Sequence, residues 1–160
     1  MRGPYICNIN RKSQTKVLSV LEIISLTEQK HLLDSFVLMQ QLRPHLVNPQ
    51  LYVEQVVRQQ QAGYRLLAIM ESSKMLGLAG YRIQENLLYG RFLYLDDLVV
   101  AHDSHSSGIG KQLLDAVRAK AVEAHCAHFV LDTGLGNARA QRFYFRNGLL
   151  SKAMHFVEVL

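Results

Sequence analysis

The order of the predicted elements indicates a mixed α/β domain in which helices flank a sheet. Three observations support this fold class. Stretches with helical periodicity alternate along the chain with short apolar runs of strand length. Two of these runs are joined by a polar turn, as in a β-hairpin. Near the end of the chain a strand, a helix and another strand follow one another, which implies at least one parallel pair and therefore a mixed sheet.

The first half of the chain predicts a strand, two helices and a hairpin. β-Branched residues are frequent in the opening apolar run, and Thr27 with Glu28 marks the start of the first helix. Arg43-Pro44 ends that helix, because proline restricts the residue before it. The second helix stops before Gly63. The predicted ranges are 17–24 for the first strand, 28–43 and 52–60 for the helices, and 66–70 and 76–83 for the hairpin strands.

The second half predicts three strands and two amphipathic helices. Two acidic residues, Asp96 and Asp97, lie within an otherwise apolar strand. Apolar positions at helical spacing follow the next turn, and Gly148 stands where the last helix is expected to end. The predicted ranges are 92–100, 129–131 and 154–160 for the strands, and 109–124 and 137–147 for the helices.

Composition and charge narrow the class of protein. The chain has 160 residues, of which 49% are hydrophobic, and a formal net charge of +5. This predicts a globular domain at 16–160 after a flexible segment at 1–15, with no membrane span and no secretory signal. The weak positive charge favours a small anionic ligand over a nucleic acid. Cys7 and Cys126 lie far apart, so we expect two free thiols in the cytoplasm.

The strongest local signal is the glycine-containing turn before the helix at 109–124. Residues 108–111 read Gly-Ile-Gly-Lys, and glycines at a helix N-terminus let backbone amides approach a phosphate. A Walker loop does not fit, because His105 and Gln112 stand where it needs Gly and Ser or Thr. The dinucleotide-binding pattern GxGxxG does not fit either, because Leu113 stands where its third glycine would be. A purely steric role for the two glycines stays open at this point.

Three motifs follow one another in the second half of the chain. They are Leu95-Asp96-Asp97-Leu98-Val99-Val100, His105-x-x-Gly108-Ile109-Gly110 and Asn137-x-x-Ala140-x-x-Phe143-Tyr144-x-x-x-Gly148. Together they resemble the GNAT superfamily of acetyl-CoA-dependent N-acetyltransferases, and the likeness extends over residues 17–160. The resemblance implies a mixed, mostly antiparallel sheet whose central parallel strands splay apart.

The resemblance also implies acetyl-CoA as co-substrate. The loop before the helix at 109–124 would hold its pyrophosphate through backbone amides, although His105 replaces the family's usual Arg or Gln and offers less charge. Backbone groups at the end of the preceding strand would hold the pantetheine arm like an added strand. The implied cofactor contacts are Leu98, Val99, Val100, His105, Ser106, Ser107, Gly108, Ile109, Gly110, Lys111 and Asn137.

Three catalytic roles follow from the resemblance and from the chemistry of acetyl transfer. Tyr144 would protonate the leaving thiolate, and the amide of Val99 or Val100 would polarise the thioester carbonyl. Asp96 would act as base or amine anchor, at a position where several family members carry a catalytic Glu. Asp97, its neighbour, is a further catalytic candidate and is expected on the opposite face by strand alternation. Whether the base is Asp96, Asp97 or a water stays open at this point. Tyr144 as a core aromatic and Asp96 as a simple cation-binding group remain open alternatives.

Several alternatives remain at this stage. The series His102-Asp103-x-His105 suggests metal ligation, but further ligands of suitable spacing are missing, so we expect a solvated turn and no metal. The acceptor would be a small-molecule or protein amine. A catalytically weak CoA-binding sensor or scaffold is the runner-up, and a nucleic-acid or protein-binding domain is a third hypothesis. The strand predicted at 154–160, with Phe156 and Val157, would allow a homodimer.

Overall fold

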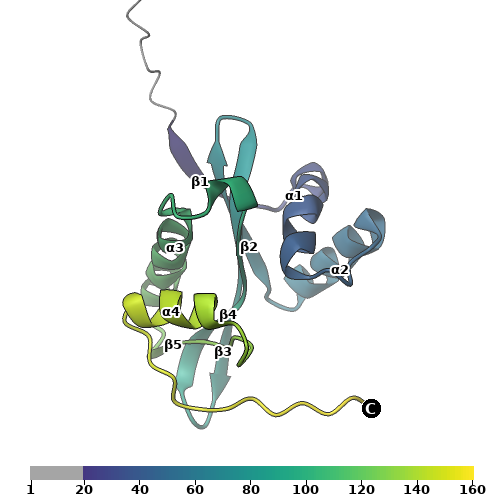
Figure 1. Ribbon diagram of the computed structural model, residues 1–160. Coiled ribbons are helices and arrows are strands. Elements are labelled where there is room, and N and C mark those ends of the chain that lie inside the picture. Colours follow the sequence, from purple (N-terminus) through teal and green to yellow (C-terminus); the bar gives the residue numbers. More distant parts are fainter. Residues whose placement is uncertain (1–19) are drawn as a thin grey trace, which may run out of the picture.

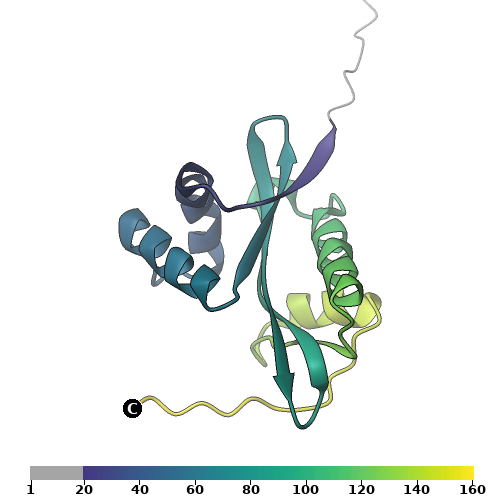
Figure 2. The ribbon, with the colours of Figure 1, turned by 180° about the vertical axis from the view of Figure 1, so that it is seen from behind.

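The computed structural model describes residues 20–160, so the segment predicted to be flexible at 1–15 and Cys7 lie outside it. One sheet carries α1 and α2 on one face and α3 with α4 on the other (Figures 1 and 2). This confirms the mixed α/β class. The elements are β1 (Leu21–Ser25), α1 (Gln29–Leu42), α2 (Pro49–Gln61), β2 (Arg65–Glu71), β3 (Lys74–Asn86), β4 (Gly90–Val100), α3 (Ile109–Glu123), β5 (His128–Leu131) and α4 (Ala138–Arg146).

The five strands lie in the order β1-β2-β3-β4-β5. The first four pair antiparallel with their neighbours. The β4–β5 pair is parallel and joins residues 92–95 only to residues 128–131. β5 ends at Leu131 while β4 continues to Val100, so residues 96–100 have no described strand beside them on that side.

Two apolar clusters hold the layers together, one on each face of the sheet. The α1/α2 cluster includes Leu32, Val53 and Leu66, and the α3 cluster includes Leu93 and Leu113. Burial of such side chains is the main favourable contribution to folding. The sheet is therefore packed on both faces, and this packing holds the end of β4 that has no β5 beside it in place.

The start of α2 differs from the sequence prediction. The helix begins at Pro49 rather than at Tyr52, because the Asn48 side chain accepts hydrogen bonds from the amides of Gln50 and Leu51. Asparagine before a proline at the first helical position is a strong helix-start signal. Ser35 of α1 then bonds the Tyr52 hydroxyl at 2.8 Å, which ties the two helices together.

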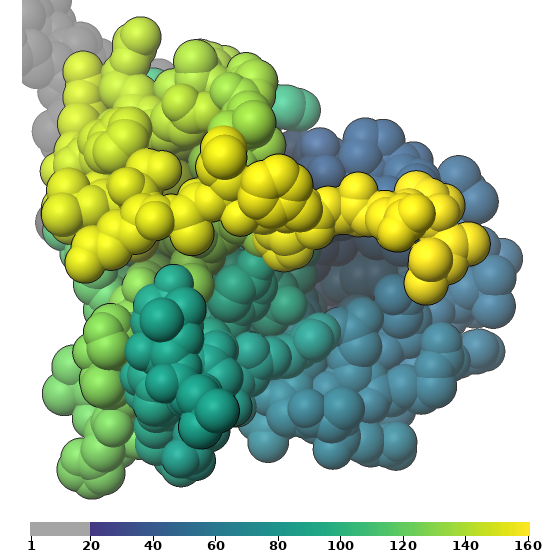
Figure 3. All heavy atoms as spheres, turned by 90° about the horizontal axis from the view of Figure 1, so that it is seen from below, coloured from purple at the N-terminus to yellow at the C-terminus, as the bar shows by residue number. Residues whose placement is uncertain are grey.

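The predicted strand at 154–160 is wrong. Residues 149–160 form an extended tail with no pairing to any described strand, and Phe156 is 83% exposed. Figure 3 shows this tail as an exposed strip that runs from α4 toward α1 and α2. Its apolar residues favour a strand locally, but a strand forms only where a neighbouring edge supplies hydrogen bonds.

Within residues 20–160 no helix combines the length and the apolar character that crossing a membrane requires. Cys126 is a free thiol.

Candidate active site

A β-bulge in β4 places the two aspartates. Gly80 pairs with Asp97 and Tyr81 with Leu95, so Asp96 has no partner on β3. An extra residue breaks the alternation of side chains along a strand. Both carboxylates consequently approach groups of the α1/α2 side, and the expectation that Asp97 faces away from Asp96 is wrong.

Asp97 is fully engaged by its neighbours. Its Oδ1 accepts from the Arg43 Nε at 3.0 Å, and its Oδ2 accepts from the Tyr64 hydroxyl at 2.8 Å. The Arg43 Nη2 also donates to the Asp96 carbonyl at 3.0 Å. A Cβ on Gly80 would lie 2.0 Å from the Tyr64 hydroxyl, so only glycine fits there. Asp97 therefore anchors the end of α1 to β4, and both of its side-chain oxygens already accept hydrogen bonds.

The side chain of Asp96 has a different environment from that of Asp97. Its Oδ2 is buried and forms no hydrogen bond within residues 20–160, and the Arg82 Nε lies 3.7 Å away, beyond hydrogen-bond distance. Burial raises the pKa of Asp96 to about 6, the Arg82 charge opposes this, and Asp97 adds to it. A carboxyl group that titrates near neutral pH is suited to general base catalysis.

The end of β4 offers backbone groups on its open side. The Ala101 amide donates to the Leu76 carbonyl at 2.8 Å, which identifies the residue pairs of the β3–β4 ladder that exchange hydrogen bonds. Hydrogen-bonded and non-hydrogen-bonded residue pairs alternate along an antiparallel ladder. The backbone N–H and C=O groups of Val99 therefore point toward β3, while those of Leu98 and Val100 point toward the gap beyond the end of β5. The amide of Val99, one of the two expected to polarise the thioester carbonyl, therefore points toward β3, whereas the amide of Val100 points toward the gap.

The loop before α3 has the geometry of an anion site. Gly108 precedes α3 with a φ of 85°, and no side chain caps the helix. Its first amides therefore point outward without side-chain partners, at the positive end of the helix dipole. A Cβ on Gly110 would lie in ordinary van der Waals contact with Val100 and Phe143, 3.5 Å away, so the start of α3 packs beside the end of β4. These features fit a diphosphate group.

Other predicted contacts in this loop are already engaged. The Ser107 hydroxyl donates to the Ser104 carbonyl at 2.5 Å, and Lys111 forms an ion pair with Asp115. The His105 ring lies 2.9 Å from the Val100 carbonyl through its Nε2. His105 thus occupies a backbone position that a pantetheine arm would use. Ser106 adopts a φ of 64°, a conformation that favours glycine.

Tyr144 lies on α4, which begins where the Asn137 side chain accepts from the Ala140 amide at 3.1 Å. Asn137 therefore caps a helix. Burial, reinforced by the charge of Asp132, raises the pKa of Tyr144 to about 12. Its hydroxyl forms no hydrogen bond to residues 20–160. The phenol stays protonated at neutral pH and is free to donate.

A cluster at the end of β5 was not predicted. The Tyr94 hydroxyl donates to the Asp132 Oδ2 at 2.5 Å, and the His155 Nδ1 lies 2.6 Å from the same oxygen. Asp132 directly follows the strand predicted at 129–131, where functional side chains often lie in parallel sheets. His155 belongs to none of the sequence motifs, and it lies in the segment that was predicted to be a strand.

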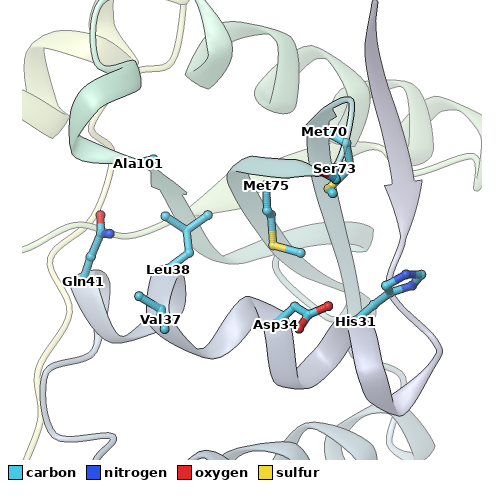
Figure 4. Close-up of a pocket in the computed structure, with 9 residues that line it drawn as sticks. All are labelled: His31, Asp34, Val37, Leu38, Gln41, Met70, Ser73, Met75 and Ala101. Atoms are coloured by element: carbon cyan, nitrogen blue, oxygen red, sulfur yellow. The ribbon is translucent and has the colours of Figure 1, made fainter.

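A separate hollow of about 280 Å³ lies between α1 and the β2–β3 hairpin (Figure 4). Its lining residues include His31, Asp34 and Met75, but none of the predicted site residues. Within residues 20–160 no group of three or more His, Cys, Asp or Glu is arranged to hold a metal ion. Asp103 of the His102-Asp103-x-His105 series pairs with Lys74 at 2.5 Å instead.

Comparisons with known proteins agree with this geometry. A model of the acetyltransferase (GNAT) family matches residues 32–149. A Bacillus subtilis (strain 168) protein named uncharacterized N-acetyltransferase YhdJ is 29% identical over 126 residues, which are 78% of this chain and 88% of that protein.

Two solved structures share the fold at low identity. Aminoglycoside N-acetyltransferase AAC(6')-Iy in complex with CoA superposes with a TM-score of 0.79 and 19% identity, over 89% of this chain and 95% of that one. The ribosomal-protein-alanine N-acetyltransferase of Brucella melitensis biovar Abortus 2308 gives 0.75 and 18%, over 88% and 100%. The chain belongs to the acetyltransferase (GNAT) family and is an enzyme that acetylates an amine with acetyl-CoA.

Proposed function

We propose that acetyl-CoA binds along the open half of β4, and that the amine attacks its thioester directly there. The uncapped amides at the start of α3 take the pyrophosphate. Backbone groups of Leu98 and Val100 take the pantetheine arm as an added strand. The observation that carries the proposal is the end of β4–β5 pairing at Leu95. It leaves a strand edge without a neighbouring strand, within the described residues, beside a helix N-terminus.

In the proposed reaction acetyl-CoA supplies the activated acyl group, and the chain supplies the proton transfers and the oxyanion site. Asp96, with its raised pKa, accepts a proton from the amine nitrogen. The amide of Leu98 or Val100 stabilises the negative charge on the thioester oxygen. The Tyr144 hydroxyl donates its proton to the leaving sulfur. Asp97 holds β4 and the end of α1 in register, and makes no proton transfer.

We propose a cationic amine as the acceptor, approaching from the side where the carboxylates lie. Asp96 and Asp132 would attract an ammonium group, since neither carboxylate is fully neutralised by Arg82 or Tyr94. The names of the structural neighbours include an aminoglycoside acetyltransferase and a ribosomal-protein-alanine acetyltransferase. Both small-molecule and protein amines therefore remain candidates, and we propose that the reaction takes place in the cytoplasm.

The proposal is tested with acetyl-CoA and a panel of amines. Acetyl-CoA is expected to raise the melting temperature, because it binds the native state only, and at least one amine is expected to stimulate thiol release. Tyr144→Phe keeps the ring and should retain the thermal shift while turnover falls by about 10²–10⁴-fold. Unchanged turnover where chemistry limits the rate would exclude Tyr144 as the donor.

A second candidate function is a catalytically weak CoA-binding module. The contact of the His105 ring with the Val100 carbonyl favours it, since the cofactor must displace that ring. Stabilisation by acetyl-CoA without amine-dependent thiol release would support this function. His105→Ala removes the competing ring, and a tighter dissociation constant would show that the contact opposes binding.

A further inference from the structure

The proton balance of the proposed reaction needs two proton acceptors. An ammonium group must lose one proton before its nitrogen can attack, and the nitrogen must lose a second proton after the C–N bond forms. Tyr144 returns only one proton, to the sulfur. Asp96 provides one acceptor, and it cannot hold both protons at once. A second acceptor close to the open half of β4 is therefore required, either water or a side chain.

His155 has the geometry of such an acceptor. Its Nδ1 lies 2.6 Å from the Asp132 Oδ2. Because a carboxylate can only accept, the hydrogen of this contact sits on Nδ1, and this tautomer of a neutral imidazole has a lone pair on Nε2. The Asp132 carboxylate is itself held by the Tyr94 hydroxyl at 2.5 Å. The side chain of His155 is 62% exposed, so a substrate can reach the ring.

The pair lies beside the residues already assigned to the reaction. The charge of Asp132 acts on Asp96 and on Tyr144, and that of Arg43 acts on Asp132. Tyr94 lies on β4 two residues before Asp96. The tail that carries His155 crosses this end of the molecule from α4 toward α1 and α2 (Figure 3). The ring is thus held beside Asp132 by the segment that lacks any strand pairing.

We propose, resting on the proposed function, that His155 takes the first proton from the cationic acceptor and that Asp132 positions its ring. The N–H bond of the ammonium breaks and its proton moves to the Nε2 of His155, where the Asp132 carboxylate offsets the new charge. The freed electron pair of the nitrogen forms the C–N bond. Asp96 takes the second proton, the C–S bond breaks, and the sulfur receives the hydrogen of Tyr144.

The experiment compares two nucleophiles in the full-length chain. One is the best cationic amine of the panel, and the other is hydroxylamine, which is mostly neutral at neutral pH and has no first proton to lose. His155→Ala is expected to lower thiol release with the cationic amine by about 10²-fold and to change the rate with hydroxylamine by less than about threefold. Imidazole in the buffer is expected to restore part of the lost rate.

Lys152→Ala is the matched control, because Lys152 lies on the same exposed tail and its side chain has no described contact. It should leave both rates unchanged. Equal losses with both nucleophiles and no rescue by imidazole would show a structural role for His155 and overturn the inference. No loss with either nucleophile would assign the first proton to water, with the same consequence.

The failure of the proposed function has a different signature. If wild type releases no thiol with any amine, with hydroxylamine or with water, the acetyltransfer site itself is misassigned and this inference falls with it. An NMR measurement of the His155 ring gives a readout that needs no acceptor. The neutral ring should carry its hydrogen on Nδ1 in wild type and lose this preference in Asp132→Asn. Hydrogen on Nε2 in wild type would contradict the proposal.

Discussion

The two halves of β4 belong to one strand but have different environments. Residues 92–95 pair with β3 on one side and with β5 on the other, and Phe92, Leu93 and Leu95 are buried. Residues 96–100 begin at the bulge and keep β3 but lose β5. The backbone of the first half is occupied on both sides and contributes to stability. The second half presents an unsatisfied carboxylate and open backbone groups, which is where a substrate can bind.

The same contrast separates the neighbours Asp96 and Asp97. Every side-chain oxygen of Asp97 has a partner, whereas Asp96 has a buried oxygen without one. Burying a carboxylate without hydrogen bonds costs stability. We therefore assign the reactive role to Asp96 and the structural role to Asp97. The predictions below test this separation, from the largest expected effect to the smallest.

Asp96→Asn should lower turnover by about 10²–10⁴-fold, because the amide cannot accept the proton of the amine. The acid limb of the kcat/KM profile near pH 6 should disappear, since the pKa of Asp96 is raised to about 6. Steady-state thiol release over pH 5–9 measures both effects. Asp97→Asn is the matched control and should cost less than tenfold. A larger loss in Asp97→Asn would reverse the assignment of base and anchor.

Asp97→Ala should destabilise the fold by about 2–3 kcal/mol, because the Tyr64 hydroxyl loses its acceptor and Arg43 loses its ion pair. Chemical denaturation at pH 7 measures the loss. Tyr64→Phe removes only one of these contacts and should cost about 1 kcal/mol. If Asp97→Ala were as stable as wild type, Asp97 would have no anchoring role.

Asp96 should also give stability an unusual pH dependence. Its pKa is about 6 in the folded state and about 3.8 in the unfolded chain, so the folded state binds the proton more tightly. Its contribution is fully present below about pH 4 and is lost as the pH rises through 6. The stability of Asp96→Asn relative to wild type should therefore grow between pH 4 and pH 7. A constant difference across this range, measured by urea denaturation, would place the Asp96 carboxylate in water.

Ser106→Gly should stabilise the protein by about 0.5 kcal/mol. Ser106 has a φ of 64°, which costs a residue with a side chain about 1–2 kcal/mol, and the larger entropy of glycine in the unfolded chain offsets part of the gain. Thermal unfolding measures the difference. Ser107→Gly serves as the control and should destabilise, since the Ser107 hydroxyl bonds the Ser104 carbonyl.

The sequence predicted the regular part of the molecule because local patterns determine it. Helical spacing located α1 and α3, and the family motifs identified the open half of β4. Strand alternation could not reveal the bulge at Asp96, since a bulge depends on the register with β3. The same limit explains the assignment of Val99 to the open side.

In the tail at 149–160, the local pattern predicted a strand that the structure does not contain. The tail's alternating apolar residues predict a strand, but the described sheet offers no edge that pairs with it. The link from Asp132 to His155 joins residues that neither spacing nor motif connects. Contacts of this kind follow from tertiary packing and were visible only in the structure. A homodimer through Phe156 and Val157 stays a prediction.

Amide hydrogen exchange at the end of β4 tests the central claim most directly. Without ligand, the Val99 amide should exchange slowly, because it faces β3, and the amides of Leu98 and Val100 should exchange faster, because they face the gap. Addition of acetyl-CoA should slow exchange at Leu98 and Val100 and leave Val99 unchanged. Binding of acetyl-CoA with no new protection at Leu98 and Val100 would contradict the account, because the cofactor would then lie elsewhere.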